Sequence, residues 1–321
     1  MSKSVAAAAL AAMLSFAAPA PAQDYPAKPL RLLVPFPPGG AVDTLGRTIA
    51  PPLSRALGQS VVVENRPGAN TVIATEIVAR APADGHTLLL MATSFTVNPV
   101  ATARLPYDSV KDFAGVTRVA YNPLIICTHP SLPVRTVKEL VGLARQRPGE
   151  LTWAVSSIIG GGRIAGEMFR DVAKINMTNV PYGGGAPAAV AVMGGHTSML
   201  IGNVLDCAPY AAAGRMRAIA VTSATRSEAM KDVPTIAESG YPGFDVTNWF
   251  GMLVRSGTPR AAVDRLNAET GRALQSKEVI DSLARLGLAP GAMKPEEFDA
   301  FIRREMEVNG RIIKALNLKV E

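Results

Sequence analysis

Cysteine is scarce in this sequence, which excludes the disulfide-rich class of small secreted folds. Only Cys127 and Cys207 occur in 321 residues, too few for a disulfide framework. In an oxidising compartment the two could form one bond, and two buried free thiols are at least as good an interpretation. The chain must therefore be held together mainly by hydrophobic cores.

Long hydrophobic runs are also scarce, and the one present lies at the start. Residues 5–18 follow Lys3 and form an apolar run that is too short to span a bilayer comfortably. A small-x-small cleavage pattern, Ala20-Pro-Ala22, comes next. We interpret residues 1–22 as a secretory signal and predict a soluble, periplasmic mature protein. An uncleaved membrane anchor is the less favoured alternative, because the run is rich in alanine and prolines interrupt it.

Blocks of one charge sign are missing as well. The chain has 33 Lys and Arg against 26 Asp and Glu, a formal net charge of +7, and only 5% aromatic residues. The basic residues are scattered, so nucleic-acid binding is not predicted. A weak positive field of this kind favours anionic small molecules.

Motifs for catalysis and metal binding are not found either. The sequence has no G-x-S-x-G, no H-E-x-x-H and no P-loop, and His86, His129 and His196 lack the spacing of metal ligands or of a catalytic triad. We therefore predict no catalytic residue, no metal and no cofactor. An exported esterase or reductase remains the third interpretation of the chain.

What the sequence does contain is a repeated strand-then-helix pattern, which indicates an α/β fold with mostly parallel strands. Helices are expected over 42–57, 71–81 with Asn70 as the N-cap, 137–147 with a capping box from Thr136, and 164–173. The tail from 259 to 316 is expected to be almost wholly helical. The expected strands include 60–64, 87–91, 124–128, 151–155, 177–180, 197–201, 216–222 and 248–254.

A proline and glycine corner joins the first strand to the first helix. Glycines there allow backbone N–H groups to converge, and the helix that follows adds a partial positive charge at its start. Such a corner suits an anion, although it is also an ordinary turn. The candidate binding residues of this corner are Phe36, Pro38, Gly39, Gly40, Ala41 and Asp43.

A second corner of the same kind follows the strand at 151–155. Its spacing departs from the dinucleotide fingerprint, and the next strand ends without an acidic residue for a ribose. Its glycines could instead serve close helix packing, and Arg163 either meets an anion or points to solvent. The candidate residues here are Ser156, Ser157, Gly160, Gly161, Gly162 and Arg163, and similar corners elsewhere add Thr93, Ser94, Tyr182 and Asn203.

The chain resembles a known family, the periplasmic receptors of tripartite tricarboxylate transporters, also called Bug receptors. The resemblance runs over essentially the whole mature chain and rests on motifs that include Phe36-Pro-Pro-Gly-Gly-x-x-Asp43, Val63-Glu-Asn-Arg-Pro-Gly68, Leu105-Pro-Tyr-Asp108, His129-Pro-Ser-Leu-Pro133, Asp232-Val-Pro-Thr235 and Trp249-Phe-Gly251.

The resemblance implies a type II periplasmic-binding-protein fold, with two α/β lobes and a ligand cleft between them. We expect residues 23–122 and 249–321 in one lobe and 123–248 in the other. The implied function is capture of a small organic carboxylate and its delivery to membrane permease subunits by a monomeric receptor. A sensory role with a signalling partner is the main alternative.

Two positions in the second lobe depart from the family pattern. Ile158-Ile159, three glycines and Arg163 replace a polar stretch that ends in His, and Gly202 and Asn203 stand where an Asp is usual. The first change is expected to make the pocket wall more apolar and to add a cation. The second removes a carboxylate that could hold an amino group. We therefore expect a carboxylate ligand without an ammonium group, and a bulky or aromatic one fits this wall.

Overall fold

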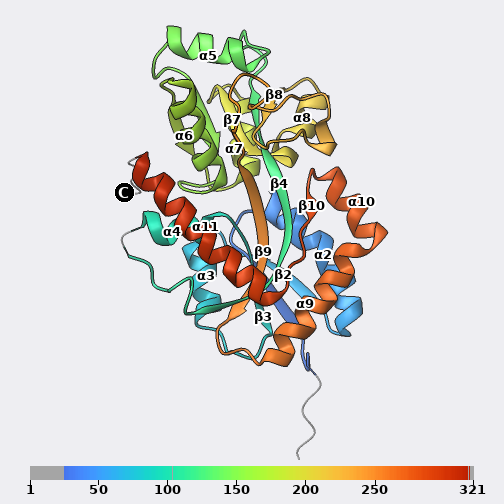
Figure 1. Ribbon diagram of the computed structural model, residues 1–321. Coiled ribbons are helices and arrows are strands. Elements are labelled where there is room, and N and C mark those ends of the chain that lie inside the picture. Colours follow the sequence, from blue (N-terminus) through green and yellow to red (C-terminus); the bar gives the residue numbers. More distant parts are fainter. Residues whose placement is uncertain (1–24, 103, 317, 319–321) are drawn as a thin grey trace, which may run out of the picture.

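A computed structural model describes residues 25–102, 104–316 and 318. The expected signal segment, 1–22, lies outside the described residues. Strands and helices alternate through most of the chain, and three long helices follow the last long strand (Figure 1). The α/β prediction is confirmed.

The strands are β1 (Leu30–Val34), β2 (Val61–Asn65), β3 (Thr87–Ala92), β4 (Phe113–Thr128), β5 (Thr152–Val155), β6 (Thr178–Pro181), β7 (Met199–Asn203), β8 (Arg217–Val221), β9 (Thr247–Arg255) and β10 (Ala289–Pro290). The helices are α2 (Ala41–Leu57), α3 (Val72–Ala79), α4 (Ser94–Ala101), α5 (Val137–Gln146), α6 (Gly161–Ala173), α7 (Gly185–Met193), α8 (Ala208–Ala212), α9 (Arg260–Gln275), α10 (Lys277–Arg285) and α11 (Pro295–Ala315). Short 3-10 turns lie at Ala69–Thr71, Val204–Asp206 and Glu228–Met230.

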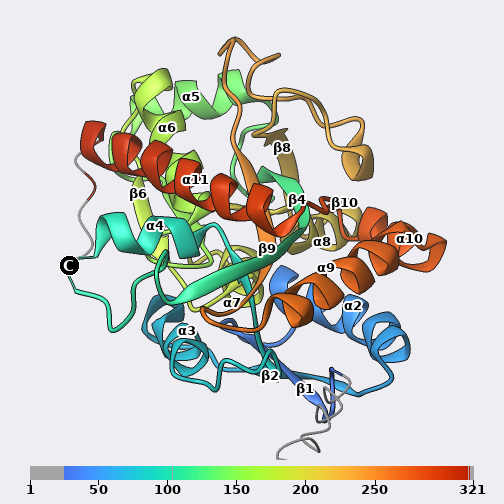
Figure 2. The same ribbon diagram turned by 60° about the horizontal axis from the view of Figure 1, so that its bottom comes forward.

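The strands form two groups that share β4. In the first, β1 lies between β2 and β3 and runs parallel to both, while β9 runs antiparallel to β3 and β4. In the second, β5 lies between β6 and β7 and runs parallel to both, while β7 and β8 pair antiparallel with β4. The result is two α/β lobes, seen as the lower and upper halves of Figure 1 and from another direction in Figure 2.

The long strand β4 carries the chain from one lobe to the other. Its residues 113–123 pair with β9, and its residues 124–128 pair with β7 and β8. Sequence reasoning expected only the second part as a strand. We propose the division 23–122 with 249–321 as lobe 1 and 123–248 as lobe 2, because the pairing partners of β4 change beside Pro123.

Each lobe has its own hydrophobic core. The main lobe 1 cluster packs α2 and α9 on the sheet and includes Leu32, Leu90 and Phe250, all fully buried. The main lobe 2 cluster is built around Trp153 and Phe169. Burial of such side chains contributes roughly 1.5–3 kcal/mol each, so each lobe has enough apolar contact to keep its own shape.

The two cysteines form a disulfide bond between Cys127 on β4 and Cys207, which follows the 3-10 turn after β7. Sequence reasoning left this pairing open against two free thiols. The bond closes a segment with a sequence separation of 80 residues and lies in a buried apolar cluster of lobe 2.

Local predictions were right for α2 and for the capping box of α5, where Thr136 accepts from the Glu139 N–H. Two were wrong. Asn70 does not cap α3, because its backbone is left-handed with φ 49° and its side chain bonds to Asn98 instead. The helix expected from 164 begins at Gly161, so the glycines of the second corner belong to its first turn.

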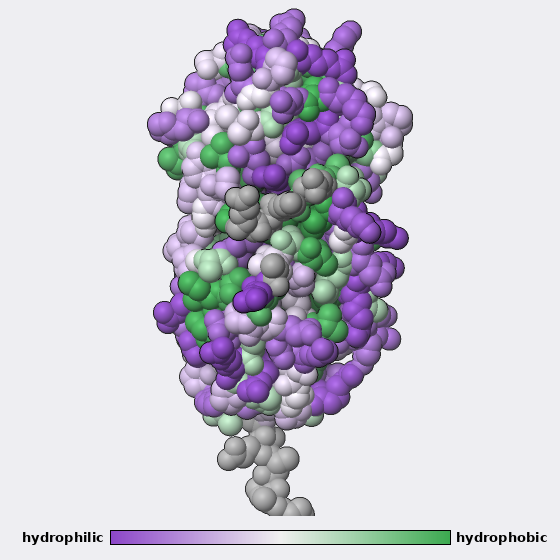
Figure 3. All heavy atoms as spheres, turned by 90° about the vertical axis from the view of Figure 1, so that its left-hand side faces the viewer, coloured by the Kyte–Doolittle hydropathy of each residue, from purple (hydrophilic) through white to green (hydrophobic). Residues whose placement is uncertain are grey.

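Hydrophilic residues cover most of the face that carries α4 and α11, and hydrophobic ones gather near the waist and on the lower lobe (Figure 3). Among the residues that the structure describes, no helix is long and apolar enough to cross a membrane.

Candidate functional site

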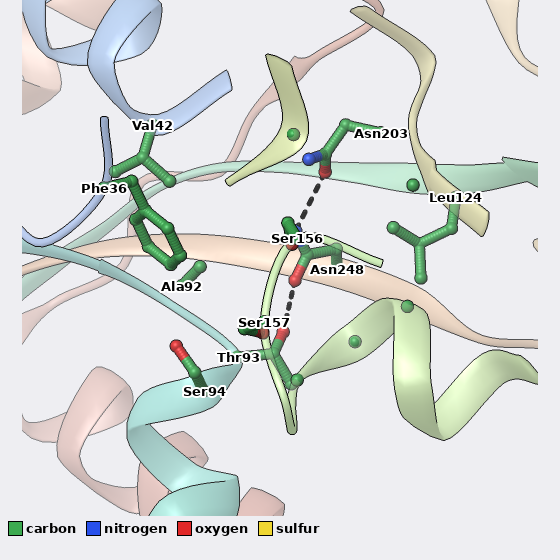
Figure 4. Close-up of a pocket in the computed structure, with 15 residues that line it drawn as sticks. Phe36, Val42, Ala92, Thr93, Ser94, Leu124, Ser156, Ser157, Asn203 and Asn248 are labelled. Carbon is green, nitrogen blue, oxygen red and sulfur yellow. Dashed lines mark hydrogen bonds between the residues drawn. The ribbon is translucent and has the colours of Figure 1, made fainter. Parts of the chain in front are cut away.

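A small pocket lies where the two lobes meet at the crossing strands, and we call it the inner pocket. Its fifteen lining residues are Phe36, Val42, Ala92, Thr93, Ser94, Leu124, Ser156, Ser157, Gly160, Gly161, Gly162, Gly185, Gly202, Asn203 and Asn248. Phe36 and Val42 lie on one side and Leu124 on the other, as Figure 4 shows. Its volume is about 30 Å³, room for about two water-sized groups, which is the size of a carboxylate.

Four helices begin at the inner pocket. The first turns of α2, α4, α6 and α7 each contribute a lining residue. At these four described starts the N-cap residues, Gly40, Thr93, Gly160 and Gly184, make no side-chain capping hydrogen bond. First-turn N–H groups have no partner within the helix, and each helix start carries roughly half a positive charge. The arrangement therefore favours a bound anion.

The lining of the inner pocket includes no charged side chain. Positive potential therefore comes from backbone dipoles rather than from Lys or Arg. Ser94 adds a hydroxyl that is buried and has no hydrogen-bond partner. A buried polar group without a partner is costly, and an anion in the pocket is an acceptor that this hydroxyl could bond.

A chain of buried hydrogen bonds forms one wall of the inner pocket. Thr93 donates its hydroxyl to the Asn248 side-chain oxygen, and the Asn248 amide donates to the Asn203 side-chain oxygen at 3.0 Å (Figure 4). Asn122 also donates to that oxygen of Asn203, at 3.3 Å. The chain of hydrogen bonds continues further into lobe 2, because the Asn203 amide donates to the carboxylate of Asp206 at 3.1 Å. These bonds fix the orientation of both pocket amides.

Asp43 holds the first corner in shape and does not line the pocket. Its carboxylate accepts from the Gly39 N–H at 2.9 Å, from Asn65 at 2.9 Å and from Arg47 at 3.0 Å. Burial alone would raise the pKa of Asp43, but these hydrogen bonds outweigh it and lower the pKa. Asn65 also donates to the Phe36 carbonyl at 3.0 Å, so Asp43 acts as a positioning residue for this loop.

Arg163 does not line the inner pocket, and its guanidinium is bound by other groups of the protein. Its Nε lies 2.8 Å from a carboxylate oxygen of Glu167, one helical turn on, and Nη1 donates to the Asn179 side chain. The guanidinium also lies 6.0 Å from the centre of the Trp153 ring. With the helix starting at Gly161, Arg163 sits in its first turn, and its guanidinium reaches Glu167 one turn further along α6.

The glycines of the second corner also have a packing role. A Cβ at Gly162 would overlap the Ile201 carbonyl of β7, and a Cβ at Gly166 would lie 2.6 Å from Trp153 Nε1. The packing interpretation and the binding interpretation of this corner are therefore compatible, since the close approach places the start of α6 at the pocket.

A larger space opens beside the inner pocket, and we call it the outer chamber. It measures about 300 Å³ and shares Phe36, Ser156 and Ser157 with the inner pocket. Its lining consists of Pro35, Phe36, Gly68, Ala69, Asn70, Thr71, Ser156, Ser157, Ile158, Pro181, Tyr182 and Gly183. Inner pocket and outer chamber together form one candidate cleft.

The two lobes touch along this cleft. A Cβ at Gly184 would lie 2.9 Å from Pro37 Cδ, so the start of α7 packs directly on the first corner. On another side, Val97 of α4 and Ile313 of α11 share a buried apolar cluster with Ile159 and Ile164 of lobe 2. Of the two isoleucines expected in the pocket wall, Ile159 joins this contact and Ile158 lines the outer chamber.

The structure brings most of the predicted binding residues together. Those that line the inner pocket are Phe36, Thr93, Ser94, Ser156, Ser157, Gly160, Gly161, Gly162 and Asn203, and Tyr182 lines the outer chamber. Those that line neither are Pro38, Gly39, Gly40, Ala41, Asp43 and Arg163. Sequence reasoning missed Val42, Ala92, Leu124, Gly185, Gly202 and Asn248 in the inner pocket. Within 25–102, 104–316 and 318, no group of three His, Cys, Asp or Glu is placed to hold a metal ion.

Comparison with known proteins gives a consistent result. Residues 45–318 match the model of the tripartite tricarboxylate transporter family receptor. Protein BugT of Bordetella pertussis is 36% identical over 314 residues, covering 97% of this chain and 96% of BugT.

Two solved structures share the fold. Rpa4515 of R. palustris, solved with adipate, has a TM-score of 0.90 at 34% identity, with 92% of this chain and 99% of that one covered. The periplasmic binding protein BugD has a TM-score of 0.87 at 29% identity, with 92% and 100% covered. The two-lobe fold is thus that of the periplasmic binding proteins, and the chain belongs to the family of tripartite tricarboxylate transporter receptors.

Proposed function

We propose that this protein is an exported receptor that closes on a small organic carboxylate and delivers it, as a monomer, to the permease subunits of a tripartite tricarboxylate-type transporter. The observation that carries the proposal is the convergence of four helix starts, none capped by the side chain of its own N-cap residue, on a pocket that no charged side chain lines. Family membership and the adipate in Rpa4515 support the same class of ligand.

The energetics agree with a receptor. Hydrogen bonds to a charged group contribute roughly 1.5–3 kcal/mol each, so four of them reach roughly 6–12 kcal/mol before the costs of association. A micromolar complex needs about 8 kcal/mol. Because association costs at least about 4 kcal/mol, these hydrogen bonds reach micromolar affinity only at the upper end of their range, and apolar contacts of the ligand add the remainder. The proposal assigns no catalytic residue.

Thermal unfolding with a panel of carboxylates tests binding. A ligand at 100-fold its dissociation constant adds about 2.7 kcal/mol to the folded state, and we expect at least one carboxylate to raise the melting temperature while its uncharged amide does not. If carboxylates and amides act alike, the anion pocket is refuted.

Delivery is tested separately, in cells. Deletion of the gene should abolish uptake of the carboxylate that binds, and uptake should return with the intact chain. N-terminal sequencing of the protein from periplasmic extract should begin at Gln23, as removal of residues 1–22 requires. Retained uptake in the deletion strain would argue for a sensory role instead.

A further inference from the structure

We infer that the outer chamber takes an uncharged, largely apolar tail, so that the ligand is a monocarboxylate rather than a dicarboxylate. The inference rests on the proposed function, since it assumes that a carboxylate group occupies the inner pocket. It assigns the tail to a wall formed by Phe36 from lobe 1 and by Ile158, Pro181 and Tyr182 from lobe 2.

The division of the ligand into a carboxylate head and an apolar tail follows from the volumes of the inner pocket and the outer chamber. The inner pocket, at about 30 Å³, holds a carboxylate but no six-carbon chain. The outer chamber, at about 300 Å³, has room for an alkyl chain or a ring. Because Phe36, Ser156 and Ser157 line both spaces, a ligand can have its head in one and its tail in the other.

Charge in the outer chamber decides what the tail can be. No charged side chain lines it. The four helix starts that serve the carboxylate head line the inner pocket, whereas the outer chamber has one helix start at its wall, that of α3 after Thr71. A second carboxylate would give up water for a single helix start and no cation, which is costly. Tyr182 and Ser156 offer neutral hydroxyls, whose hydrogen bonds are weaker than those of a cation.

Asn70 and Asn98 hold part of the chamber wall in place through a pair of hydrogen bonds. The Asn70 amide group donates to the Asn98 side-chain oxygen at 2.6 Å, and Asn98 in turn donates to the Asn70 carbonyl at 2.9 Å. Because a backbone carbonyl can only accept, this pair of bonds fixes both amides. The Asn70 side chain is thus tied into the wall and adds no positive charge to the outer chamber.

The wall segment around Asn70 is held by hydrogen bonds within the protein. Ala69, Asn70 and Thr71 all have positive φ, at 45°, 49° and 77°, which is costly for residues other than glycine. Asn98, fully buried on α4, holds this conformation through bonds to Asn70 and to the Thr71 hydroxyl. A fixed wall favours selection by shape and charge, because the segment does not need to be ordered on binding.

Two matched ligand pairs test the inference by calorimetry: hexanoate against adipate, and 4-methylbenzoate against terephthalate. Within each pair a terminal methyl group is replaced by the second carboxylate, so the two ligands have nearly the same length and shape. We expect the monocarboxylate to bind at least tenfold more tightly in at least one pair. In neither pair do we expect the dicarboxylate to bind more tightly. Equal or tighter binding of a dicarboxylate would overturn the inference and leave the proposed function standing. If none of the four binds while another carboxylate of the panel does, the inference is overturned and the proposed function stands.

A charge introduced into the outer chamber provides a second test. Ile158 is 46% exposed, so Ile158→Arg can fold, and it should improve binding of adipate relative to hexanoate by at least tenfold. Val172 on α6 is also 46% exposed and lines neither space. Val172→Arg therefore has the same net charge and should leave the ratio unchanged. If the ratio of adipate to hexanoate affinity shifts equally in both variants, or in neither, the outer chamber does not set the preference between monocarboxylates and dicarboxylates.

Discussion

The side-chain amide of Asn248 on β9 donates a hydrogen bond to the side-chain oxygen of Asn203, at the end of β7, with a length of 3.0 Å. Thr93 of lobe 1 donates to the other end of Asn248. The two lobes are thus joined through one buried amide on a crossing strand, and this amide lies in the wall of the inner pocket. A change at Asn248 should therefore affect stability and anion binding together.

Asn248→Asp should bind carboxylates at least tenfold more weakly than Asn248→Ala at pH 8. Both variants lose the N–H donor to Asn203, which costs about 1–3 kcal/mol of stability, but only the aspartate adds a negative charge beside the anion. Isothermal titration at matched ionic strength measures the difference. Equal affinity of the two variants would place the bound anion elsewhere.

Gly184→Ala should weaken ligand binding without a matching loss of stability. The added Cβ would lie 2.9 Å from the ring of Pro37 in the other lobe, so it should oppose the approach of the lobes rather than the packing within either one. We expect at least a tenfold loss of affinity. Gly142→Ala on α5 is the control, since nothing lies within 4 Å of a Cβ at that position and Gly142 lines neither space. Similar affinities for both variants would show that the lobes can close without this contact.

Arg163→Ala should leave carboxylate affinity within twofold of the native protein and lower stability by about 1–2 kcal/mol. The guanidinium pairs with Glu167, a buried carboxylate that Arg170 also contacts, so one partner remains after the substitution. Titration and chemical denaturation separate the two effects. A large loss of affinity would restore the ligand role that the sequence suggested.

The first corner was predictable because its parts are contiguous in sequence. Phe36 precedes the glycines and a helix begins directly after them, so a local pattern indicated the turn and the helix start. The pattern did not indicate which residues face the pocket, because only Phe36 of the six candidates lines it. The start of α6 was misplaced because three glycines have low helix propensity, whereas close packing on β7 at Ile201 holds them in the helix.

The outer chamber and the role of Asn248 in the pocket wall could not be predicted from the sequence in the same way. Asn70 and Ile158 lie far apart in the sequence and meet only because the lobes touch, and positive φ at three successive non-glycine residues leaves no compositional sign. Asn248 looked like an ordinary strand residue. The available signal was its amide at the start of an otherwise apolar strand that crosses between the lobes.

Deprotonation of Asp206 should lower the free energy of unfolding as pH rises from about 4 to 6. Its carboxyl group is buried, and burial raises the pKa to about 6 despite the opposing hydrogen bonds from Asn203. In the unfolded chain the pKa is near its ordinary value of 3.8, so folding favours the protonated form. The stabilisation is complete below the unfolded pKa and is lost as pH rises through the folded pKa, with an upper limit of about 3 kcal/mol.

Asp206→Asn provides the comparison, because the amide oxygen can still accept from Asn203 but cannot titrate. Urea denaturation of both proteins from pH 4 to pH 7.5 gives the difference in unfolding free energy, which cancels the titration of every other group. We expect the native protein to lose stability relative to Asp206→Asn as pH rises to about 6, and the difference to level off above it. A difference that does not change with pH would mean that the Asp206 carboxyl keeps an ordinary pKa, and therefore that water or a cation reaches it behind Asn203.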